Sequence, residues 1–370
     1  MARKAGKKGS WLKKLMVFLN LIALLALLAA YAALYIDPRT FWPLAFAGLA
    51  YPVILATNLF FVLAWLVTWK KYLFISLIAI LAGWSQIMTL FPVRFSGTAP
   101  QPTGTMKVIS YNIHGFNYIQ SDYSDTQRKA SRFLRLEQPD FACFQEFKPR
   151  GGETTSSFGD SIGLPLFYQK NYLEYRDPAV VFGLAIFTRH PVLQTGYLRD
   201  DRNRVFAVWA DIRHRTGIYR IYDCHLVSIR FGTKEYSFYE DLKKQETEQL
   251  ALKEGIFNIL RKLKKAFILR SEQTDKLISS IRMSPYPVIL AGDLNDSPFS
   301  YCYHQLTRTL NDSFREAGKG WAGNTFAGRL PSYRIDYILH GKKLRAIGYT
   351  KHTIGYSDHY PVSVTLKQAD

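Results

Sequence analysis

Three long runs of uncharged, mostly apolar residues near the N-terminus constrain this chain more than any other feature. The runs cover Leu15 to Ile36, Phe41 to Trp69 and Tyr72 to Val93. A helix needs about 20 apolar residues to cross a bilayer, so each run is long enough to span a membrane. Pro43 and Pro52 in the second run predict a kink or a later start of that helix. The sequence therefore predicts three transmembrane helices.

The charges that flank these runs predict their orientation. Six Lys or Arg lie in the first 14 residues, and Lys70 and Lys71 lie between the second and third runs, whereas the first connection holds only Arg39. Cytoplasmic loops are rich in Lys and Arg, which places the N-terminus and the Lys70–Lys71 turn in the cytoplasm. Three crossings then leave the rest of the chain outside the cytoplasm. We expect an integral membrane protein with an extracytoplasmic C-terminal domain.

A linker separates the apolar part from a domain of mixed composition. Residues 96–105 read SGTAPQPTGT, which is typical of a linker. We therefore expect a membrane anchor at 1–95 and a folded domain at 106–370. In that domain strand-like runs alternate with helix-like segments, notably Ser124 to Glu137 and Tyr239 to Arg282. This alternation indicates an α/β domain.

The net charge of +19 divides into +9 for residues 1–103 and +10 for the rest of the chain, and the excess in the C-terminal domain suits a polyanion or an anionic membrane surface as partner. The most basic segment, residues 261–270, is either a solvated helix face or a surface that contacts anionic lipid or nucleic acid. The three cysteines, Cys143, Cys224 and Cys302, form no CxxC pair, which argues against a zinc knuckle. Cys143 and Cys224 lie in apolar runs, so we expect buried thiols, and a disulfide only if their strands are neighbours.

Polar side chains recur where strand-like runs end. These residues are Asn112, Glu146, His225, Asp293 with Asn295, Asp336, and Asp358 with His359. A turn or a cap explains any one of them. The ends of different strands can converge on one cleft, however, so the recurrence predicts a single site built from several strands.

The segment GDLND is the most informative of these motifs. In an extended segment, Asp293 and Asn295 would point to the same face. There the carboxylate can take a proton from water, and the amide can orient that water or donate to a phosphoryl oxygen. The alternative is an Asx-turn after the strand, which Gly292 and Pro298 suit.

The other polar residues suit metal binding and proton transfer. Mg²⁺ needs only one or two carboxylates, which Glu146 and Asp358 supply, with Asn112 as a neutral ligand or orienting group. His225 lies in an apolar strand, where a core histidine is the alternative interpretation. Asp336 lies among apolar residues, and a buried carboxylate needs a partner, for which histidine is suitable.

In order along the chain, these motifs resemble the endonuclease/exonuclease/phosphatase superfamily, which includes deoxyribonucleases, exonuclease III, neutral sphingomyelinases and inositol polyphosphate 5-phosphatases. The resemblance covers Met106 to Leu366 and rests on SYNIHG, FQEF, GLAIFTRHPV, CHLVS, GDLNDSP, NTF, RIDYI and SDHYPV. It implies a four-layer α/β sandwich, in which two mixed β-sheets are flanked by helices. It also implies an active site at one edge of the sheets.

The resemblance implies a metal and a water-activating group at that edge. Glu146, as the principal ligand, would hold Mg²⁺, or Mn²⁺ in its place, together with Asn112. Asp358 would help to hold the metal or the water. Asp293 would activate or orient the attacking water, and Asn295 would steady the water and the phosphate.

The resemblance also implies roles for the histidines. His359, oriented by Asp336, would donate to the phosphoryl oxygen as negative charge develops. His225 would be a second phosphate-contacting or acid group. Glu174 and Asp177 are both candidates for the acid that orients His225.

We therefore expect a membrane-anchored, divalent-metal-dependent phosphodiesterase whose substrate is nucleic acid or a membrane phospholipid, with no obligate protein partner. The alternative is a catalytically inactive domain used for binding or as a scaffold. Since such a domain usually loses an acid, amide or imidazole position, the complete set disfavours it. A channel or transporter is disfavoured because tyrosine is the only ionisable residue type inside the apolar runs.

Overall fold

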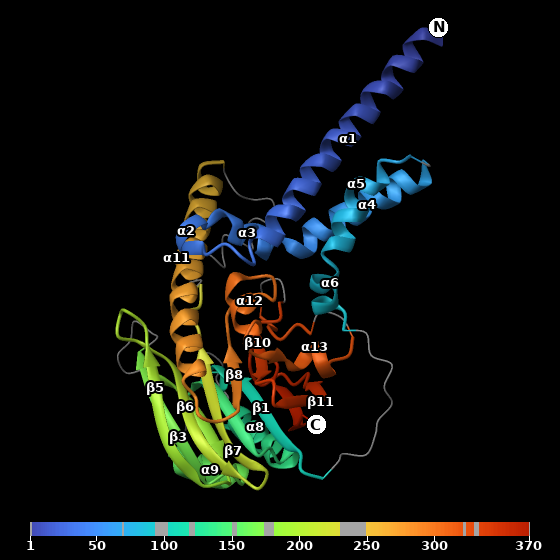
Figure 1. Cartoon of the computed structure of the whole chain (residues 1–370). Helices are drawn as coiled ribbons and strands as arrows, with labels where there is room; N and C mark the ends of the chain where they lie inside the picture. Colours follow the sequence, from blue (N-terminus) through green and yellow to red (C-terminus); the bar gives the residue numbers. More distant parts are fainter. Residues whose placement is uncertain are drawn as a thin grey trace.

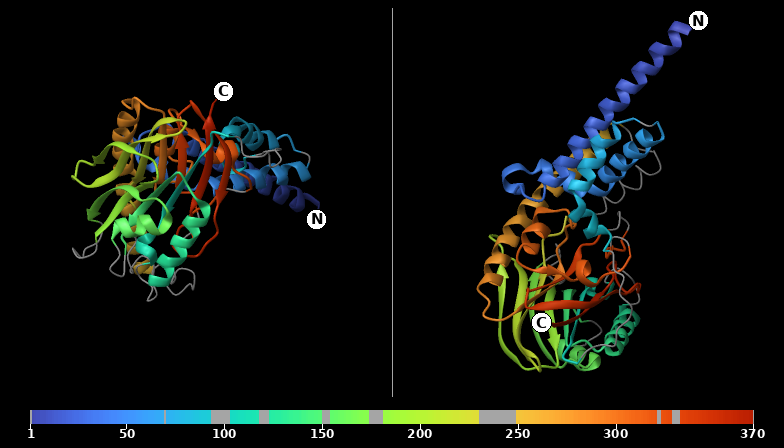
Figure 2. Two further views of the ribbon diagram at one scale, coloured as in Figure 1. Left: turned by 90° about the horizontal axis from the view of Figure 1, so that it is seen from below. Right: turned by 45° about the vertical axis from the view of Figure 1, so that its right-hand side comes forward.

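The fold was taken from a computed structural model of the chain, in which an elongated group of helices at the N-terminus rests on a β-sandwich (Figures 1 and 2). The structure describes residues 2–68, 70–92, 103–117, 123–149, 154–173, 181–229, 249–320, 323–328 and 333–369. The N-terminus lies at the far end of α1, and the C-terminus lies in the sandwich (Figure 2).

Two six-stranded sheets form the sandwich. Their strand orders are β11-β12-β1-β2-β4-β3 and β5-β6-β7-β8-β10-β9. The strands are β1 Met106–Asn112, β2 Phe141–Phe147, β3 Leu166–Leu173, β4 Val181–Thr188, β5 Val192–Arg199, β6 Val205–His214, β7 Gly217–His225, β8 Val288–Asp293, β9 Asn311–Asp312, β10 Asp336–His340, β11 Leu344–Lys351 and β12 Val362–Gln368. Both sheets are mixed: β1 is parallel to β2 and antiparallel to β12, and β8 is parallel to β7 and antiparallel to β10. The expected α/β sandwich is confirmed.

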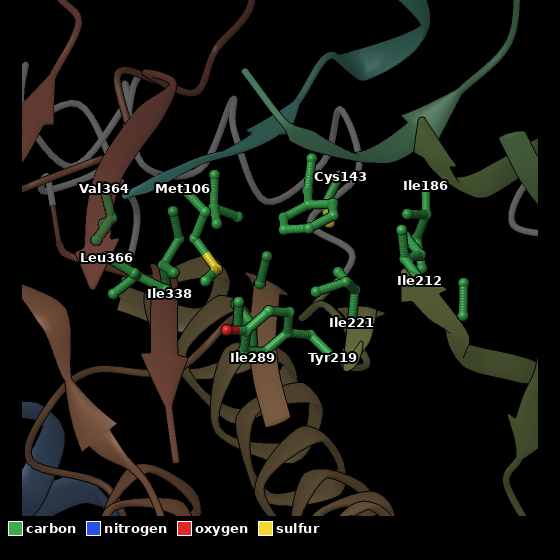
Figure 3. Packing of buried hydrophobic residues seen from close by; sticks show 14 of the residues in the cluster. Met106, Cys143, Ile186, Ile212, Tyr219, Ile221, Ile289, Ile338, Val364 and Leu366 are labelled. Carbon is green, nitrogen blue, oxygen red and sulfur yellow. The ribbon is translucent and has the colours of Figure 1, made fainter. Parts of the chain in front are cut away.

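The sheets pack face to face through an apolar core. Successive residues of a strand point to opposite faces, so each sheet contributes alternate residues to this core. Its members include Met106, Cys143, Ile186, Ile221, Ile289, Ile338 and Val364 (Figure 3). Strands β2 and β7, which carry Cys143 and Cys224, are buried on both faces, which is typical of continuous apolar runs.

Helices cover the outer face of each sheet, and a further group of helices lies at the N-terminus. The helices are α1 Ala2–Ala32, α2 Pro38–Phe41, α3 Pro43–Leu49, α4 Tyr51–Val67, α5 Leu73–Ala82, α6 Trp84–Leu90, α7 His114–Asn117, α8 Tyr123–Glu137, α9 Thr155–Ile162, α11 Gln249–Arg282, α12 Tyr301–Thr307 and α13 Ser313–Ala317. Helices α8 and α9 pack on the first sheet, and α11 and α12 pack on the second. The helix expected at Ser124 to Glu137 is present as α8. The helix expected at Tyr239 to Arg282 is present as α11 from Gln249 onward, and residues 239–248 lie outside the described residues.

All three cysteines are buried free thiols, which confirms the expectation for Cys143 and Cys224. Cys143 lies on β2 in the first sheet and Cys224 lies on β7 in the second. Burial raises the pKa of both thiols well above the ordinary value, which keeps them protonated. They therefore serve as small apolar residues of the core.

The expectation of three transmembrane helices is not confirmed. Among the residues that the structure describes, only the segment Trp11–Ala32 of α1 forms one helix that is long and apolar enough to cross a membrane. The second run is divided into α3 and α4, which are bent by 67°, and the third into α5 and α6, which are bent by 70°. The described helices therefore provide one span, or up to three if each bent pair crosses once.

Proline and glycine explain the two bends. Pro52 lacks an N–H group and disfavours helical geometry in the residue before it, so α4 starts anew after Ala50. At Gly83 a side chain is excluded, because an added Cβ would lie 1.9 Å from the hydroxyl oxygen of Tyr31. With 10 residues, α5 is only about 15 Å long, about half the thickness of a bilayer core.

A buried polar contact joins three of the N-terminal helices. Ser76 Oγ on α5 lies 2.6 Å from Asn20 Oδ1 on α1 and 2.8 Å from Asn58 Oδ1 on α4. Asn58 Nδ2 also donates to the carbonyl of Ala23 at 2.9 Å. Polar contacts of this kind hold helices together in an apolar environment, where the hydrophobic effect does little.

Candidate active site

Chain direction brings the predicted polar residues to one edge of the sandwich. Strands β1, β7 and β8 end at Asn112, His225 and Asp293. Asp336 was expected at the end of a strand, but it is the first residue of β10. Because β10 is antiparallel to β8, with Asp336 opposite Asp293, the start of one strand lies beside the end of the other. For the same reason His359, which precedes antiparallel β12, lies at this edge.

Asp293 is at the centre of the group. The carboxylate is 1 % exposed. Its Oδ2 accepts a hydrogen bond of 3.1 Å from Asn112 Nδ2. The same oxygen lies 3.6 Å from His225 Nε2 and 3.8 Å from His359 Nε2. One carboxylate oxygen thus faces an amide and two imidazoles, which come from both sheets and from the loop before β12.

The environment of Asp293 raises its pKa to about 6. Burial is the main cause, because it penalises the charged carboxylate, and the negative field of Asp336 adds to it. The nearby His359 and His225 oppose the shift. A carboxyl whose pKa is close to neutrality is suited to accept a proton from water.

The geometry of GDLND differs from the extended segment that was expected. Strand β8 ends at Asp293, and Asn295 has the left-handed φ of 51°. The backbone N–H of Asn295 donates to Asp293 Oδ1 at 2.7 Å, which is the Asx-turn considered as the alternative. Asn295 Nδ2 donates to the carbonyl of Leu226 at 3.0 Å. The turn therefore places the backbone N–H of Asn295 against the Asp293 carboxylate and its side-chain amide against Leu226, because Asn tolerates the left-handed region.

Glu146 reaches the edge through a β-bulge. The register of β2 against β4 shifts between Phe144 and Phe147, and Glu146 has a φ of 51°. This conformation is rare for a glutamate and occurs mainly where function needs it. The side chain is 17 % exposed, and its Oε1 lies 3.3 Å from Asn112 Nδ2 and 3.8 Å from His225 Nε2. The bulge therefore re-aims the carboxylate toward the group around Asp293.

His359 and Asp336 form a buried pair. His359 Nδ1 donates to Asp336 Oδ2 at 2.9 Å. Burial alone would lower the pKa of His359, but the negative charges of Asp336 and Asp293 outweigh it and raise the pKa well above the ordinary value. The imidazole is thus held as a cation whose Nε2 points toward Asp293. The ring of Phe326 lies edge-on against it, with ring centroids 5.3 Å apart.

Asp358 has a partner that sequence reasoning missed. His114 Nδ1 lies 2.9 Å from Asp358 Oδ1. Burial raises the pKa of Asp358, but the hydrogen bond from His114 and the field of His359 outweigh it and lower the pKa to about 2. Burial lowers the pKa of His114, but Asp358 and Glu146 raise it to about 9. The signal in the sequence was His114 itself, two residues after Asn112 within SYNIHG.

A second missed pair lies between the sheets, just behind the site. Gln145 Nε2 on β2 donates to Asp223 Oδ1 on β7 at 2.5 Å, and the N–H of Ala185 donates to the other carboxyl oxygen at 3.2 Å. Burial raises the pKa of Asp223 well above the ordinary value. Gln145 precedes Glu146 and Asp223 lies two residues before His225, so this pair joins the strands that carry both site residues.

The comparisons with known proteins agree with this geometry. Residues 109–359 match the endonuclease/exonuclease/phosphatase family. The chain belongs to this family. Residues 13–90 match a domain of unknown function, and no curated protein matches the sequence. Endonuclease/exonuclease/phosphatase proteins are hydrolases of phosphoester bonds, so the chain carries a phosphoesterase fold.

Solved structures share this fold at low sequence identity. The catalytic domain of human Nocturnin with bound sulfate is 16 % identical, with a TM-score of 0.53 over 73 % of this chain and 96 % of that chain. An endonuclease/exonuclease/phosphatase protein from Beutenbergia cavernae is 17 % identical, with a TM-score of 0.51 over 72 % of each chain. One from Leptotrichia buccalis is 17 % identical, with a TM-score of 0.50 over 71 % of this chain and 99 % of that chain.

Endonuclease/exonuclease/phosphatase enzymes typically need a divalent metal, and the donor groups of this site fit one. Ligand atoms of Asp293, Asp336 and His359 lie within 4.8 Å of one another, but the protonated imidazole of His359 cannot bind a cation, so only the carboxylates of this group are candidate ligands. Asp336 Oδ1 is buried without a hydrogen-bond partner among the described residues, so it is available to a cation. Glu146 and Asp358, with side chains 17 % and 36 % exposed, are the carboxylates nearer to solvent. Glu174 and Asp177 lie outside the described residues.

A second group of possible metal ligands lies elsewhere in this phosphoesterase fold: Asp140, His190 and His214. The N–H of Thr216 donates to His214 Nδ1 at 3.2 Å, so Nδ1 is an acceptor and a proton is on Nε2, which lies 3.7 Å from Asp140. His190 Nε2 lies 3.1 Å from the same carboxylate, and the N–H of Lys107 donates to it at 2.8 Å. We therefore interpret this group as a hydrogen-bonded structural cluster.

Proposed function

We propose that the chain is a membrane-anchored, Mg²⁺-dependent phosphodiesterase that uses water as the nucleophile. The observation that carries the proposal is the meeting of an amide and two imidazoles around the buried carboxylate of Asp293. These groups come from β1, β7, β8 and the loop before β12, so their proximity requires the whole sandwich. The family match supports phosphoester hydrolysis as the reaction class.

In the proposed mechanism Asp293 accepts the proton of the attacking water. Its pKa of about 6 leaves the carboxylate mostly ionised at neutral pH and still basic enough for this step. Asn112 holds Asp293 and Glu146 in place, since its amide nitrogen lies 3.1 and 3.3 Å from their carboxylate oxygens. Asn295 fixes the turn through its backbone N–H.

The histidines address the phosphate. His359, kept protonated by Asp336, donates from Nε2 to a phosphoryl oxygen as negative charge develops there. His225 Nε2 lies 3.6 Å from the same oxygen of Asp293 that His359 faces and is the second phosphate-contacting or acid group. Such positioned donors act in a water-poor site, where they stabilise charge more than in bulk water.

The metal would be held by Glu146 and Asp358, with Asn112 as a neutral ligand or orienting group. Bound there, Mg²⁺, or Mn²⁺ in its place, supplies positive charge against the phosphate. His114 holds the carboxylate of Asp358 in its ionised form, which is the form that binds a cation.

We propose the domain limits 1–95 for the anchor, 96–105 for the linker and 106–370 for the catalytic domain. Helix α1 crosses the bilayer with the basic N-terminus in the cytoplasm. The bent pairs α3–α4 and α5–α6 together return the chain to the same side, whether each crosses or both re-enter. One or three crossings both place the catalytic domain outside the cytoplasm. The test is a C-terminal fusion to a reporter protein that works only in the cytoplasm. Activity of that reporter would overturn this topology.

The direct test of function is hydrolysis of bis(4-nitrophenyl) phosphate by the full-length protein in detergent. We expect release of nitrophenol with Mg²⁺, its loss on addition of EDTA, and its recovery when Mg²⁺ is restored. Supercoiled plasmid in the same buffer would report internal cleavage of DNA. A folded protein that hydrolyses neither substrate under any divalent metal contradicts the proposal.

A further inference from the structure

The catalytic edge of the sandwich faces the anchor helices. Strand β8 ends at Asp293, and the chain continues into α12, which lies between β8 and helices α1 and α3 (Figure 1). The view turned by 45° shows the same order of anchor, connecting helices and sandwich (Figure 2). The site therefore lies on the membrane side of the catalytic domain.

The loop after Asp293 is built into the anchor. Phe299, six residues later, is 2 % exposed and belongs to the apolar cluster formed by α1, α4 and α5. Its ring lies 4.1 Å from that of Tyr51, measured between centroids. The backbones approach so closely that a Cβ added to Gly48 would lie 2.5 Å from the carbonyl oxygen of Phe299. This explains why a residue without a side chain stands at Gly48.

The segment before Asp336 contacts the same part of the anchor. The hydroxyl of Tyr333, three residues before Asp336, donates to the carbonyl of Leu49 at 3.3 Å. Both segments that carry a buried site carboxylate therefore touch the bend between α3 and α4, which includes Leu49 and Tyr51.

Helix α11 makes a second row of contacts with the anchor. Ser271 Oγ donates to Asp37 at 2.8 Å, and Arg39 donates to Asp275 at 2.5 Å. The ring of Phe267 lies 5.3 Å from that of Phe46 in an edge-to-face contact. Two separate rows of contacts hold the sandwich on the anchor, so the site cannot turn away from the membrane without breaking them.

The N-terminal half of α11 runs beside α2 toward the N-terminal helices (Figure 1), and its exposed surface combines apolar residues with cations. One face carries Lys253, Phe257, Leu260, Arg261 and Lys264 at spacings of three or four residues. Phe257 is 67 % exposed, and the described residues provide no cover for it. Lys264 lies 4.8 Å from the ring of Trp42 in the anchor. Exposed apolar groups beside cations favour the headgroup region of anionic bilayers.

We infer that the substrate of this site is a membrane amphiphile, whose phosphodiester lies in the bilayer surface beside Asp293. The inference rests on the proposed hydrolase function and narrows its substrate class. A lipid headgroup reaches the site by diffusion within the membrane, and the α11 face attracts anionic lipid to the same place. A nucleic-acid duplex that approaches this edge meets the anchor and the bilayer instead of open solvent.

The test compares two probes that share one scissile bond. Full-length protein is reconstituted in vesicles of phosphatidylcholine and phosphatidylglycerol with Mg²⁺, and given hexadecyl 4-nitrophenyl phosphate or methyl 4-nitrophenyl phosphate. We expect kcat/KM for the hexadecyl probe to be higher by about tenfold or more, because the chain confines it beside the site. Equal values, or faster cleavage of plasmid DNA than of the hexadecyl probe, overturn the inference and leave the hydrolase function standing. If neither nitrophenyl probe nor plasmid DNA is hydrolysed, both the inferred substrate class and the proposed hydrolase function are overturned.

A variant pair separates the α11 surface from simple partitioning of the probe. We expect Phe257→Asp combined with Arg261→Glu to lower the ratio of the hexadecyl to the methyl rate by about threefold or more. Arg345→Glu, an exposed charge reversal on β11, is the matched control and should leave both rates unchanged. An unchanged ratio in the α11 variant would remove that helix from the inference.

Discussion

Asn112 on β1 donates a hydrogen bond of 3.1 Å to Asp293 on β8, and this bond joins the two sheets of the sandwich at the candidate site. The same amide nitrogen lies 3.3 Å from Glu146 on β2. One neutral side chain thus keeps two carboxylates close together without adding a third charge. Because Asn112 and Asp293 belong to different sheets, the site forms only when the two sheets pack together.

We expect Asn112→Leu to lower kcat by about a hundredfold. The change removes a donor from the buried carboxylate of Asp293 and releases Glu146 from its position. A buried acceptor that loses its partner destabilises the fold by about 1–3 kcal/mol, so the melting temperature should also fall. Steady-state kinetics and thermal unfolding measure the two effects, and wild-type kinetics in a folded variant would contradict this role.

Asp336 and His359 should act as one unit. We expect Asp336→Asn to lower kcat by about 10²- to 10⁴-fold, because the imidazole loses the carboxylate that holds its proton and orientation. His359→Ala should have a similar effect. The double variant should be no worse than the more damaged single variant, since groups in one chain of contacts are strongly non-additive. Multiplicative losses would show that the two residues act independently.

Glu146 should set the affinity for the metal. We expect Glu146→Gln to raise the Mg²⁺ concentration that gives half-maximal activity by about 10- to 100-fold, because an amide replaces the ionised oxygen that a hard cation prefers. Glu137→Gln is a suitable control, since Glu137 pairs with Lys107 away from the site. Titration of activity with Mg²⁺ measures the difference. An identical Mg²⁺ dependence in the wild type and Glu146→Gln would exclude Glu146 as a ligand.

The Asp140 cluster predicts how stability depends on pH. Burial raises the pKa of Asp140, but the nearby imidazole of His214 and hydrogen bonds from the N–H of Lys107 and from His190 outweigh it and lower the pKa well below the ordinary range. A lowered pKa in the folded state stabilises the protein above the unfolded pKa of about 3.9, and this stabilisation is lost as pH falls further. We expect Asp140→Asn to destabilise the fold by about 1–3 kcal/mol at pH 7.

The control for this prediction is to compare the thermal stability of the wild type and Asp140→Asn in acid as well as at pH 7. The difference in melting temperature between the wild type and Asp140→Asn should shrink as pH falls below about 4, because Asp140 then becomes protonated in the unfolded chain, whereas the folded chain keeps it ionised until stronger acid. A difference that is constant from pH 7 to pH 3 would show that packing, and not the ionised carboxylate, stabilises this region.

Much of the sandwich was predictable from sequence because its strands are short, continuous apolar runs. Strands β1, β2, β7 and β8 each end near a polar residue of the site, so local pattern placed Asn112, Glu146, His225 and Asp293. Local pattern carries no information about pairs that form only between distant segments. The bond between His114 and Asp358 joins residues 244 positions apart, and it became visible only in the folded chain.

Other differences have backbone causes. The second and third apolar runs are long enough to span a membrane, but breaks near Ala50 and at Gly83 divide them into bent pairs. The GDLND segment turns at Asn295 instead of extending, because an Asx-turn competes with the strand. Apolar length and period-two alternation therefore locate the segments, and single residues decide where each helix or strand stops.

The most direct measurement is hydrolysis of bis(4-nitrophenyl) phosphate with Mg²⁺ by wild type, Asp293→Asn and Asp160→Asn. Asp160 is an exposed carboxylate on α9, so its variant controls for loss of charge. The account predicts that Asp160→Asn retains the wild-type rate, whereas Asp293→Asn, with the same fold by circular dichroism, loses activity by about 10³-fold or more. An Asp293→Asn protein as active as the wild type would contradict the central claim that this buried carboxylate activates the water.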